Sequence, residues 1–354
     1  MKIIRLTALL DFGGQERKYI LFSEKPSLLK HDYIFSAIGH GGHAEKLIKE
    51  RGFEVKIFNQ NPAISNIRNI WMLYKWFKKE KPDIVHTAAA EANFHGVIAA
   101  KLAGVPYVIA EEIGFPNHSG KAKIVFKYVY RLVSKVVCVS KAVKEFLIQI
   151  GEIKEPKGIV IYNPVGDVAI KQRQLTDVFT IVCVGRLEKV KNQQLLVRAF
   201  SEMTNKKSKL IIVGDGRERE NLEQLIKELG LQDRIEITGF TPNPEQYLQK
   251  ANLFVLPSLS EGFGIAVVEA MLQKVPCLCS KVGGIPEFIE EGKTGWLFDP
   301  LQESELVTKL NQCANMDHEA MEMIGENGYH SIENAFTVEN YVQQLESLYE
   351  AKKQ

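Results

Sequence analysis

The sequence predicts an α/β protein built from two doubly wound domains. Short runs of β-branched and other apolar residues alternate with longer amphipathic segments along the whole chain, as in parallel sheets made of βα units. This alternation breaks once, between residues 163 and 177, where Pro164 and Gly166 stand and apolar periodicity is lost. The 354 residues are 45% hydrophobic and 25% charged, which suits two hydrophobic cores and excludes a disordered or fibrous chain.

The predicted elements follow in order. In the first half the strands are 2–6, 33–37, 54–58, 84–86, 107–110, 135–139 and 158–162. In the second half they are 179–184, 209–213, 235–238, 253–257, 276–280 and 295–298. Helix-length amphipathic segments separate them, and the last, 338–354, is expected to cross back to the first domain. The expected domains are 1–163 with 338–354, and 178–337, joined by the linker 164–177.

The charge is unevenly spread between the halves. Residues 1–175 carry 27 Lys and Arg against 16 Asp and Glu, whereas the rest of the chain carries 18 against 27. One interpretation is drift of surface charge, and the sharper one is that the basic half faces an anionic surface. The apolar runs are too short to cross a bilayer and the amino terminus lacks secretory features, so a cytoplasmic protein is expected. The five cysteines show no paired spacing, so neither disulfides nor a zinc site are expected.

The most informative segment is 257–269, where a buried strand ends, a glycine-bearing loop follows, and a helix begins at Ile265. This arrangement directs backbone N–H groups and a helix dipole at an anion, and therefore predicts a phosphate site. Glu261 precedes the helix and Glu269 lies within it, roughly 7 to 8 Å further along. The two carboxylates are too far apart for a close acid/base pair, and suit groups on either side of a phosphate, as in a sugar joined to a nucleoside by a diphosphate.

Arg186 and Lys191 follow the first strand of the second domain and could hold such a diphosphate. The alternative is an ordinary solvated basic loop. The sequence has no Asp-x-Asp pair after a strand of the kind that would indicate a divalent metal site. Neither a metal nor another cofactor is therefore expected.

Further motifs fall in a characteristic order. They are 185–186, Lys191, 213–216, 238–240, 257–258, 261–264, 283–287 and 292–295 in the second half, and 13–16, 83–86, 103–106 and 137–141 in the first. With them the chain resembles the retaining family 4 glycosyltransferases of the GT-B fold, in which two Rossmann-like domains face each other across a cleft. The resemblance is nearly continuous over the second half and looser over the first.

The resemblance implies a role for each matching residue. Arg186 and Lys191 would bind the diphosphate of a nucleotide sugar, and Glu269 would bind the ribose. The donor sugar and distal phosphate would meet Glu261, Gly262, Phe263 and Gly264, the turn with Gly239, Phe240 and Thr241 would hold the base, and Gly13 and Gly14 would approach the phosphate from the acceptor-binding first domain. The acceptor would attack on the face that the diphosphate leaves, without metal or protein nucleophile. UDP is the expected nucleotide, and a saccharide or polyprenyl-linked saccharide of a lipopolysaccharide or capsule is the expected acceptor.

One position departs from the family pattern. Members usually carry a histidine after the strand at 107–110, whereas this chain has Glu112. We expect Glu112 to contact the donor sugar as part of the catalytic site. The alternative is that His86 or His118, on the acceptor side, supplies the imidazole.

Two basic segments predict contact with a membrane surface. In 121–137 a cation recurs every four residues among apolar and aromatic groups, and 71–81 has a similar composition. We expect these segments to lean on anionic lipid at the inner face of the cytoplasmic membrane; the alternative is that the aromatics are core and the lysines are solvated. No recognition motif for nucleic acid accompanies the charge, so no nucleic-acid partner is expected.

Two other functions share the fold. A nucleotide-sugar epimerase would need no acceptor and would lack the spacing between Glu261 and Glu269. A non-catalytic GT-B subunit that stabilises a partner enzyme would have no reason to retain Arg186, Lys191, Glu261 and Glu269. A dehydrogenase is excluded because the third glycine of its fingerprint is missing after Gly216.

Overall fold

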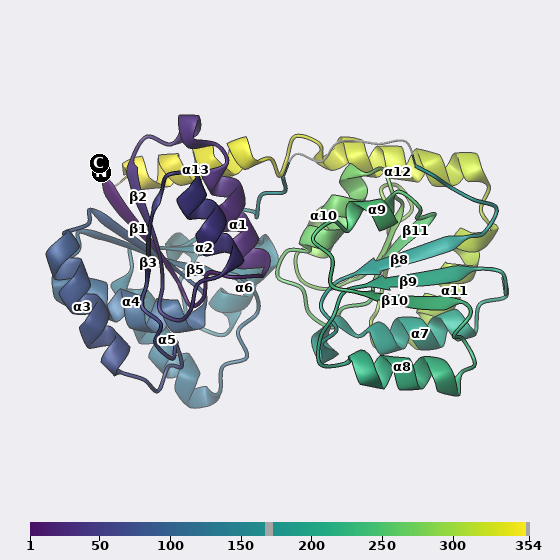
Figure 1. The fold of residues 1–354 in the computed structure, drawn as a ribbon, viewed down its shortest axis with the longest axis horizontal. Helices are drawn as coiled ribbons and strands as arrows, with labels where there is room; N and C mark the ends of the chain where they lie inside the picture. The colour runs from purple at the N-terminus through teal and green to yellow at the C-terminus, as the bar shows by residue number, and fades with distance from the viewer. Residues whose placement is uncertain (167–172, 352–354) are drawn as a thin grey trace. The chain divides into compact units, whose positions relative to one another are not determined.

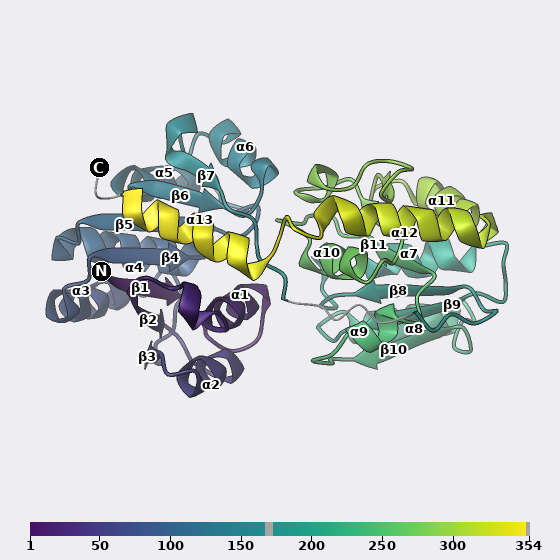
Figure 2. The same cartoon turned by 90° about the horizontal axis from the view of Figure 1, so that it is seen from above.

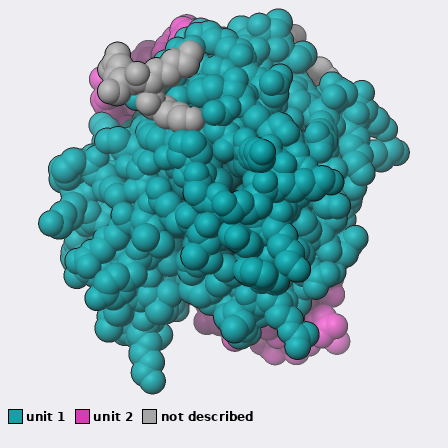
Figure 3. Space-filling view, turned by 90° about the vertical axis from the view of Figure 1, so that its left-hand side faces the viewer, with its two compact units in different colours: residues 1–166, 336–354 teal, residues 167–335 magenta. Residues whose placement is uncertain are grey.

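The computed structural model describes residues 1–166 and 173–351, which form two compact units. Unit 1 comprises Met1–Gly166 and Phe336–Gln354, and unit 2 comprises Asp167–Ala335 (Figure 3). Part of the predicted linker, residues 167–172, lies outside the described residues, as does the end of the predicted last helix, 352–354.

Unit 1 is built on a parallel seven-stranded sheet in the order β3-β2-β1-β4-β5-β6-β7. Its strands are β1 (Lys2–Thr7), β2 (Asp32–Ala37), β3 (Glu54–Ile57), β4 (Ile84–Ala88), β5 (Tyr107–Glu112), β6 (Lys135–Cys138) and β7 (Gly158–Val160). Its α-helices are α1 (Gly14–Ser23), α2 (His43–Glu50), α3 (Arg68–Glu80), α4 (Ala90–Ala103), α5 (Gly120–Leu132), α6 (Lys141–Gln149) and α13 (Val338–Glu350). Helices α3, α4 and α5 pack side by side on one face, while α1, α2 and α13 cover the other (Figures 1 and 2).

The last helix belongs to the core of the first unit. Thr337 caps α13 by accepting a hydrogen bond from the N–H of Asn340, and the helix then buries Val342 and Leu345 against β1, β2 and α1. An N-cap hydroxyl and an apolar stripe at helical spacing account for this element locally.

Unit 2 has a parallel six-stranded sheet in the order β10-β9-β8-β11-β12-β13. Its strands are β8 (Thr180–Val184), β9 (Lys209–Val213), β10 (Ile235–Gly239), β11 (Leu253–Leu256), β12 (Cys277–Ser280) and β13 (Trp296–Phe298). Its α-helices are α7 (Gln193–Ser201), α8 (Arg219–Glu228), α9 (Glu245–Leu248), α10 (Ile265–Leu272), α11 (Glu303–Asn315) and α12 (His318–Ile332).

The predicted fold class is confirmed, and every predicted strand is present in the predicted order. Two local predictions are wrong. Strand β5, predicted to end at residue 110, continues through Glu111 and Glu112, which pair with β6. The interior can hold these carboxylates because Lys18 contacts Glu111 and Asn93 donates a hydrogen bond to Glu112. Helix α5 ends at Leu132, so Lys135 lies in β6, in agreement with the strand predicted at 135–139, and does not continue the basic stripe predicted for 121–137. Among the described residues, no helix is long and apolar enough to cross a membrane.

Candidate active site

The carboxyl edge of the unit 2 sheet has a topological switch point between β8 and β11. From β8 the chain continues to β9 on one side, and from β11 it continues to β12 on the other, so the loops after the two strands diverge. Open α/β sheets bind ligands in the crevice that such divergence leaves. The N–H of Leu259 donates to the carbonyl oxygen of Val190 at 2.8 Å and joins the two loops.

An ion pair links predicted site residues across this point. Lys191 ends the short 3₁₀ turn Lys189–Lys191 after β8, and Glu261 lies on the loop after β11. The Lys191 ammonium is 2.6 Å from the Glu261 carboxylate, with side chains 19% and 15% exposed. Both groups are therefore accessible to a ligand, and the ammonium is a positive charge that a phosphate can share.

Arg186 lies on the same loop as Lys191, with its side chain in solvent. Its backbone carbonyl accepts a hydrogen bond from the side-chain amide of Gln193 at 3.0 Å. The loop is packed tightly against the turn after β9, since a Cβ on Gly214 would lie 2.0 Å from the carbonyl oxygen of Gly185. Only glycine fits this approach, and it holds the Arg186 backbone at the edge of the sheet.

The start of α10 completes this edge. Gly264 precedes the helix at a φ of 105°, a conformation that favours glycine. The N–H groups of the first turn of a helix have no intrahelical acceptors and attract anions. Phe263 packs against Phe288, and Gly284 donates its N–H to the carbonyl oxygen of Glu261 at 3.3 Å. Gly262 and Glu261 thus lie on a braced loop beside the helix terminus.

The other predicted donor-binding residues lie on the same edge or in the helix behind it. Gly239 ends β10, followed by Phe240, which is 65% exposed, and by the half-buried Thr241. Glu269 is 6% exposed within α10. Phe240 is thus an exposed flat surface on which a base can stack.

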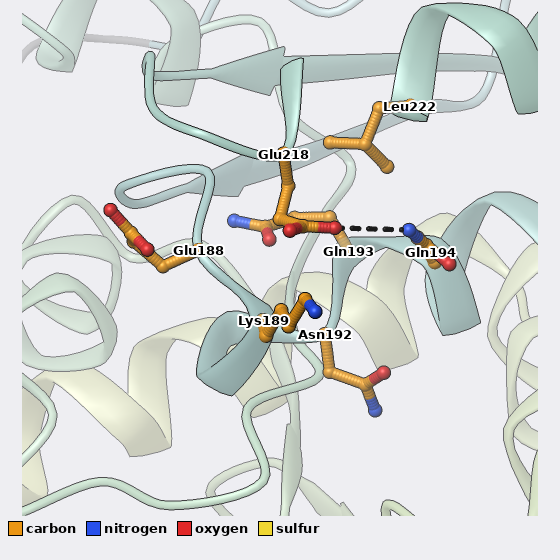
Figure 4. Close-up of a pocket in the computed structure, with 7 residues that line it drawn as sticks. All are labelled: Glu188, Lys189, Asn192, Gln193, Gln194, Glu218 and Leu222. Atoms are coloured by element: carbon orange, nitrogen blue, oxygen red, sulfur yellow. Dashed lines mark hydrogen bonds between the residues drawn. The ribbon is translucent and has the colours of Figure 1, made fainter. Parts of the chain in front are cut away.

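A small polar pocket lies behind the Lys191 loop. It has a volume of about 170 Å³ and opens between the 3₁₀ turn, α7 and the start of α8 (Figure 4). Its lining residues are Glu188, Lys189, Asn192, Gln193, Gln194, Glu218 and Leu222. The side-chain amide of Gln194 donates to Glu218 at 3.2 Å across it. None of the predicted site residues lines this pocket, so it is separate from the predicted anion site.

Unit 1 buries Glu112 at the end of β5. The carboxylate is 4% exposed and accepts hydrogen bonds from the Tyr130 hydroxyl and from the Asn93 side chain, the latter at 3.1 Å. Burial raises the pKa of Glu112 to about 7, with the nearby charge of Glu152 adding to the increase. Glu112 is therefore poised to change its protonation state near neutral pH.

The two predicted acceptor-side histidines lie in different surroundings. His118 forms a 2.7 Å contact with the carboxylate of Glu152 and stacks on Phe126. His86 is fully buried on β4, with Nδ1 2.7 Å from the Tyr349 hydroxyl, and burial lowers its pKa to about 4. The structure therefore does not bring His86 and His118 together.

The exposed Gly13 and Gly14 lie at the amino terminus of α1. They follow β1, which borders the switch point of the unit 1 sheet, between β1 and β4. Among the described residues, no three His, Cys, Asp or Glu side chains are grouped so as to hold a metal ion.

Comparison with known proteins identifies the family. Residues 13–167 match Glycosyltransferase Family 4, and residues 168–331 match Glycosyl transferases group 1. The chain belongs to the family 4 glycosyltransferases. An Escherichia coli relative named UDP-Gal:alpha-D-GlcNAc-diphosphoundecaprenol alpha-1,3-galactosyltransferase is 28% identical over 84% of this chain and 83% of its own length. The capsular polysaccharide biosynthesis glycosyltransferase CapM of Staphylococcus aureus is 26% identical over 80% and 81%.

Solved structures show the same fold. The Anabaena protein HepE, solved in complex with UDP-glucose, superimposes with a TM-score of 0.84 at 23% identity, covering 99% of this chain and 100% of its own. TarM superimposes with a TM-score of 0.78 at 14% identity, covering 98% of each chain. This glycosyltransferase therefore has the GT-B fold.

Sequence patterns missed the polar partners of β5 in this glycosyltransferase. Lys18 on α1 and Arg5 on β1 are both buried and surround Glu111, with an Arg5 nitrogen 3.7 Å from a Glu111 oxygen and Lys18 in direct contact. Burial alone would raise the pKa of Glu111, but Lys18, His86 and Arg5 together hold it well below its usual range. The only sign of these partners in the sequence is the pair of adjacent glutamates at the end of an apolar strand. We name Arg5, Lys18, His86 and Glu111 the buried ionic cluster.

The raised pKa of Glu112 predicts a stability difference that depends on pH. Folded Glu112 keeps its proton up to about pH 7, whereas unfolded Glu112 loses it at the lower, ordinary pKa of a glutamate. The protonated carboxyl therefore favours the folded state. This stability is fully present below the unfolded pKa and is lost as pH rises from that pKa through the folded pKa. Glu112→Gln retains an amide oxygen for Tyr130 and Asn93 but cannot ionise. Between pH 4 and pH 8 the unfolding free energy of Glu112→Gln should therefore rise by about 3 kcal/mol relative to wild type.

Urea unfolding of both proteins across this range measures the difference. The exposed Glu145→Gln on α6 is the matched control and should follow the wild-type pH profile. A constant difference between Glu112→Gln and wild type would contradict a titrating Glu112.

Proposed function

We propose that this glycosyltransferase is a retaining, metal-independent enzyme that transfers a sugar from a UDP-sugar to a hydroxyl of a saccharide or lipid-linked saccharide. Its role would be the assembly of a bacterial-type surface polysaccharide at the inner face of the cytoplasmic membrane. The observation that carries the proposal is the contact between Lys191 and Glu261 at the switch point between β8 and β11, with Arg186 on the Lys191 loop and Glu261 on the loop that leads into α10. Two cations and a helix amino terminus suit a diphosphate.

The site supports a reaction in which the protein positions groups and stabilises charge. The acceptor oxygen forms a bond to the anomeric carbon on the face where the bond to the diphosphate oxygen breaks. The acceptor proton passes to the departing phosphate oxygen, and Lys191 and Arg186 balance the charge that develops there. Glu261, freed from Lys191 when the phosphate takes over that ammonium, then accepts hydrogen bonds from donor-sugar hydroxyls.

Relatives support the choice of substrates. The name of the Escherichia coli galactosyltransferase specifies a UDP-sugar donor and an undecaprenol-linked acceptor, and a Campylobacter jejuni relative likewise acts on a diphospho-undecaprenol acceptor. HepE was solved with UDP and with UDP-glucose. These names favour UDP over other nucleotides and a lipid-linked acceptor over a free one.

Nucleotide-sugar binding tests this proposal. A UDP-sugar at 100 times its dissociation constant should stabilise the protein by about 2.7 kcal/mol, whereas GDP- and ADP-sugars at the same concentration should stabilise it less. Thermal unfolding with a panel of these donors measures the effect. Preferential stabilisation by GDP- or ADP-sugars would contradict the UDP assignment.

The anomeric configuration of the product tests retention. With the stabilising donor and an acceptor present, NMR should show the linkage configuration of the donor, and an added chelator should leave the rate unchanged. Inverted product would overturn the retaining assignment, and loss of activity with chelator would overturn metal independence. Donor conversion to a free sugar or an epimer at an unchanged rate without any acceptor would favour the epimerase alternative.

A further inference from the structure

Helix α5 carries apolar side chains on two opposite faces. Phe126, Val129 and Tyr130 point into unit 1 and are buried. Across the helix, Ile124, Val125, Tyr128 and Leu132 remain 59%, 40%, 59% and 44% exposed. Ile124, Tyr128 and Leu132 recur every four residues, and Val125 stands three before Tyr128, so all four share one outward face. Core packing explains why the first set is apolar, but it does not explain why the exposed second set is apolar.

Cations accompany the outward stripe. Lys121, Lys127 and Arg131 are exposed on α5, and the Arg131 guanidinium lies 5.2 Å from the centre of the Tyr128 ring. Residues 120–132 contain no Asp or Glu. A face with exposed aliphatic and aromatic groups, several cations and no acid complements a surface that is apolar just below an anionic layer.

Helix α3, on the other side of α4 from α5, repeats this combination. Trp71 is 58% exposed and Ile67, which precedes the helix, is 67% exposed, while Lys75 lies 5.4 Å from the centre of the Trp71 ring. Helix α4 contacts both α3 and α5, so all three cover the same face of the sheet (Figure 1). At the end of α4, Leu102 adds another apolar side chain, 60% exposed. The two basic segments of the sequence therefore belong to one side of unit 1.

We propose that the outward face of α3 and α5 docks unit 1 onto a bilayer containing anionic phospholipid, with Ile124, Tyr128 and Trp71 entering the interface between headgroups and acyl chains. The exposed aliphatic side chains distinguish this partner from nucleic acid, whose phosphates would use only the cations. The inference rests on the proposed function in one respect: a lipid-linked acceptor is presented at such a surface. Vesicle binding by the free enzyme does not depend on it.

Sedimentation with vesicles tests the docking face. The full chain should pellet with phosphatidylcholine vesicles that contain one third phosphatidylglycerol, remain in solution with phosphatidylcholine alone, and be released by about 0.5 M salt. Ile124→Gln combined with Tyr128→Gln should weaken binding at least about tenfold, because both side chains lose their apolar contact. Leu301→Gln, which removes an 81% exposed side chain from unit 2, is the matched control and should bind like wild type.

Charge variants separate the electrostatic part. Lys121→Gln and Lys127→Gln should each weaken binding about fivefold at low salt. Lys46→Gln, on α2 at the opposite face of the sheet, should leave binding unchanged. Trp71 emission should shift to shorter wavelength on binding.

The outcomes distinguish docking from function. Failure of wild type to pellet, equal binding to both vesicle types, or unchanged binding of the α5 variants would overturn the docking inference. Nucleotide-sugar stabilisation should be equal in wild type and the α5 variants, so its absence from all of them would count against the proposed function alone.

Discussion

Replacing Lys191 with methionine should lower kcat/KM for the donor by about 10²- to 10³-fold. The ammonium faces the Glu261 carboxylate at 2.6 Å at the switch point, where the proposed mechanism places the departing diphosphate. Removing a positioned group that stabilises developing charge typically has an effect of this size. Methionine keeps most of the aliphatic stem, so packing of the turn is preserved.

Steady-state kinetics with varied UDP-sugar measure this loss, and a fall in kcat would place it in the transition state rather than in donor binding alone. Lys189→Met provides the control, because Lys189 lies on the same 3₁₀ turn, is exposed and faces the separate pocket. The Lys191–Glu261 pair is partly solvated, so the unfolding free energy of Lys191→Met should change by no more than about 1 kcal/mol. Full activity in Lys191→Met would remove the main support for the diphosphate site.

Replacing Glu111 with glutamine should destabilise unit 1 by about 3 to 5 kcal/mol. The carboxylate is 1% exposed and is the counter-charge for Lys18 and Arg5, which are equally buried. Removing it leaves two buried cations without a counter-charge. Breaking a buried ion pair by removing one partner in this way strongly lowers the unfolding free energy. At pH 7 the ionised Glu111 makes its full contribution to stability, so the full loss should be measured there. Because the pKa of folded Glu111 is depressed, that contribution is lost only as pH falls below the unfolded pKa and through the folded pKa.

Urea unfolding followed by hydrogen exchange of the β1, β4 and β5 amides measures this effect within unit 1. Glu54→Gln, an exposed glutamate on β3, should change stability by less than about 0.5 kcal/mol. Adding Lys18→Met to Glu111→Gln removes one of the stranded cations, so the double variant should lose less stability than the two single changes summed. Strictly additive losses would mean that the charges of the buried ionic cluster do not interact.

The sequence was sufficient to predict the sheets because parallel strands are buried on both faces and appear as continuous apolar runs. β11 and β12 illustrate this, since every residue in them is buried. The strand β5 was predicted too short because charged residues normally end such a run. Only the fold shows that Lys18, 93 positions away in the sequence, donates a hydrogen bond to Glu111.

The candidate site could be predicted only in part. Motif order identified Lys191 and Glu261 separately, but their pairing depends on which strands are neighbours, and β8 and β11 are adjacent although two strands intervene in sequence. The environment of Glu112 was not predictable, because Asn93 and Tyr130 come from α4 and α5. Likewise, composition could not tell which aromatics of α5 are core and which are exposed.

The position of α13 has a consequence for how the chain matures on the ribosome. Arg5 donates to Tyr341 at 3.0 Å and His86 contacts Tyr349, so the two segments of unit 1, which unit 2 separates in sequence, share one interior. Unit 1 is therefore completed only after unit 2 has been translated, and until then the face of its sheet that α1 and α2 cover lacks α13. During that interval the charged groups beneath α13 remain hydrated, and their desolvation is deferred to the final step of assembly.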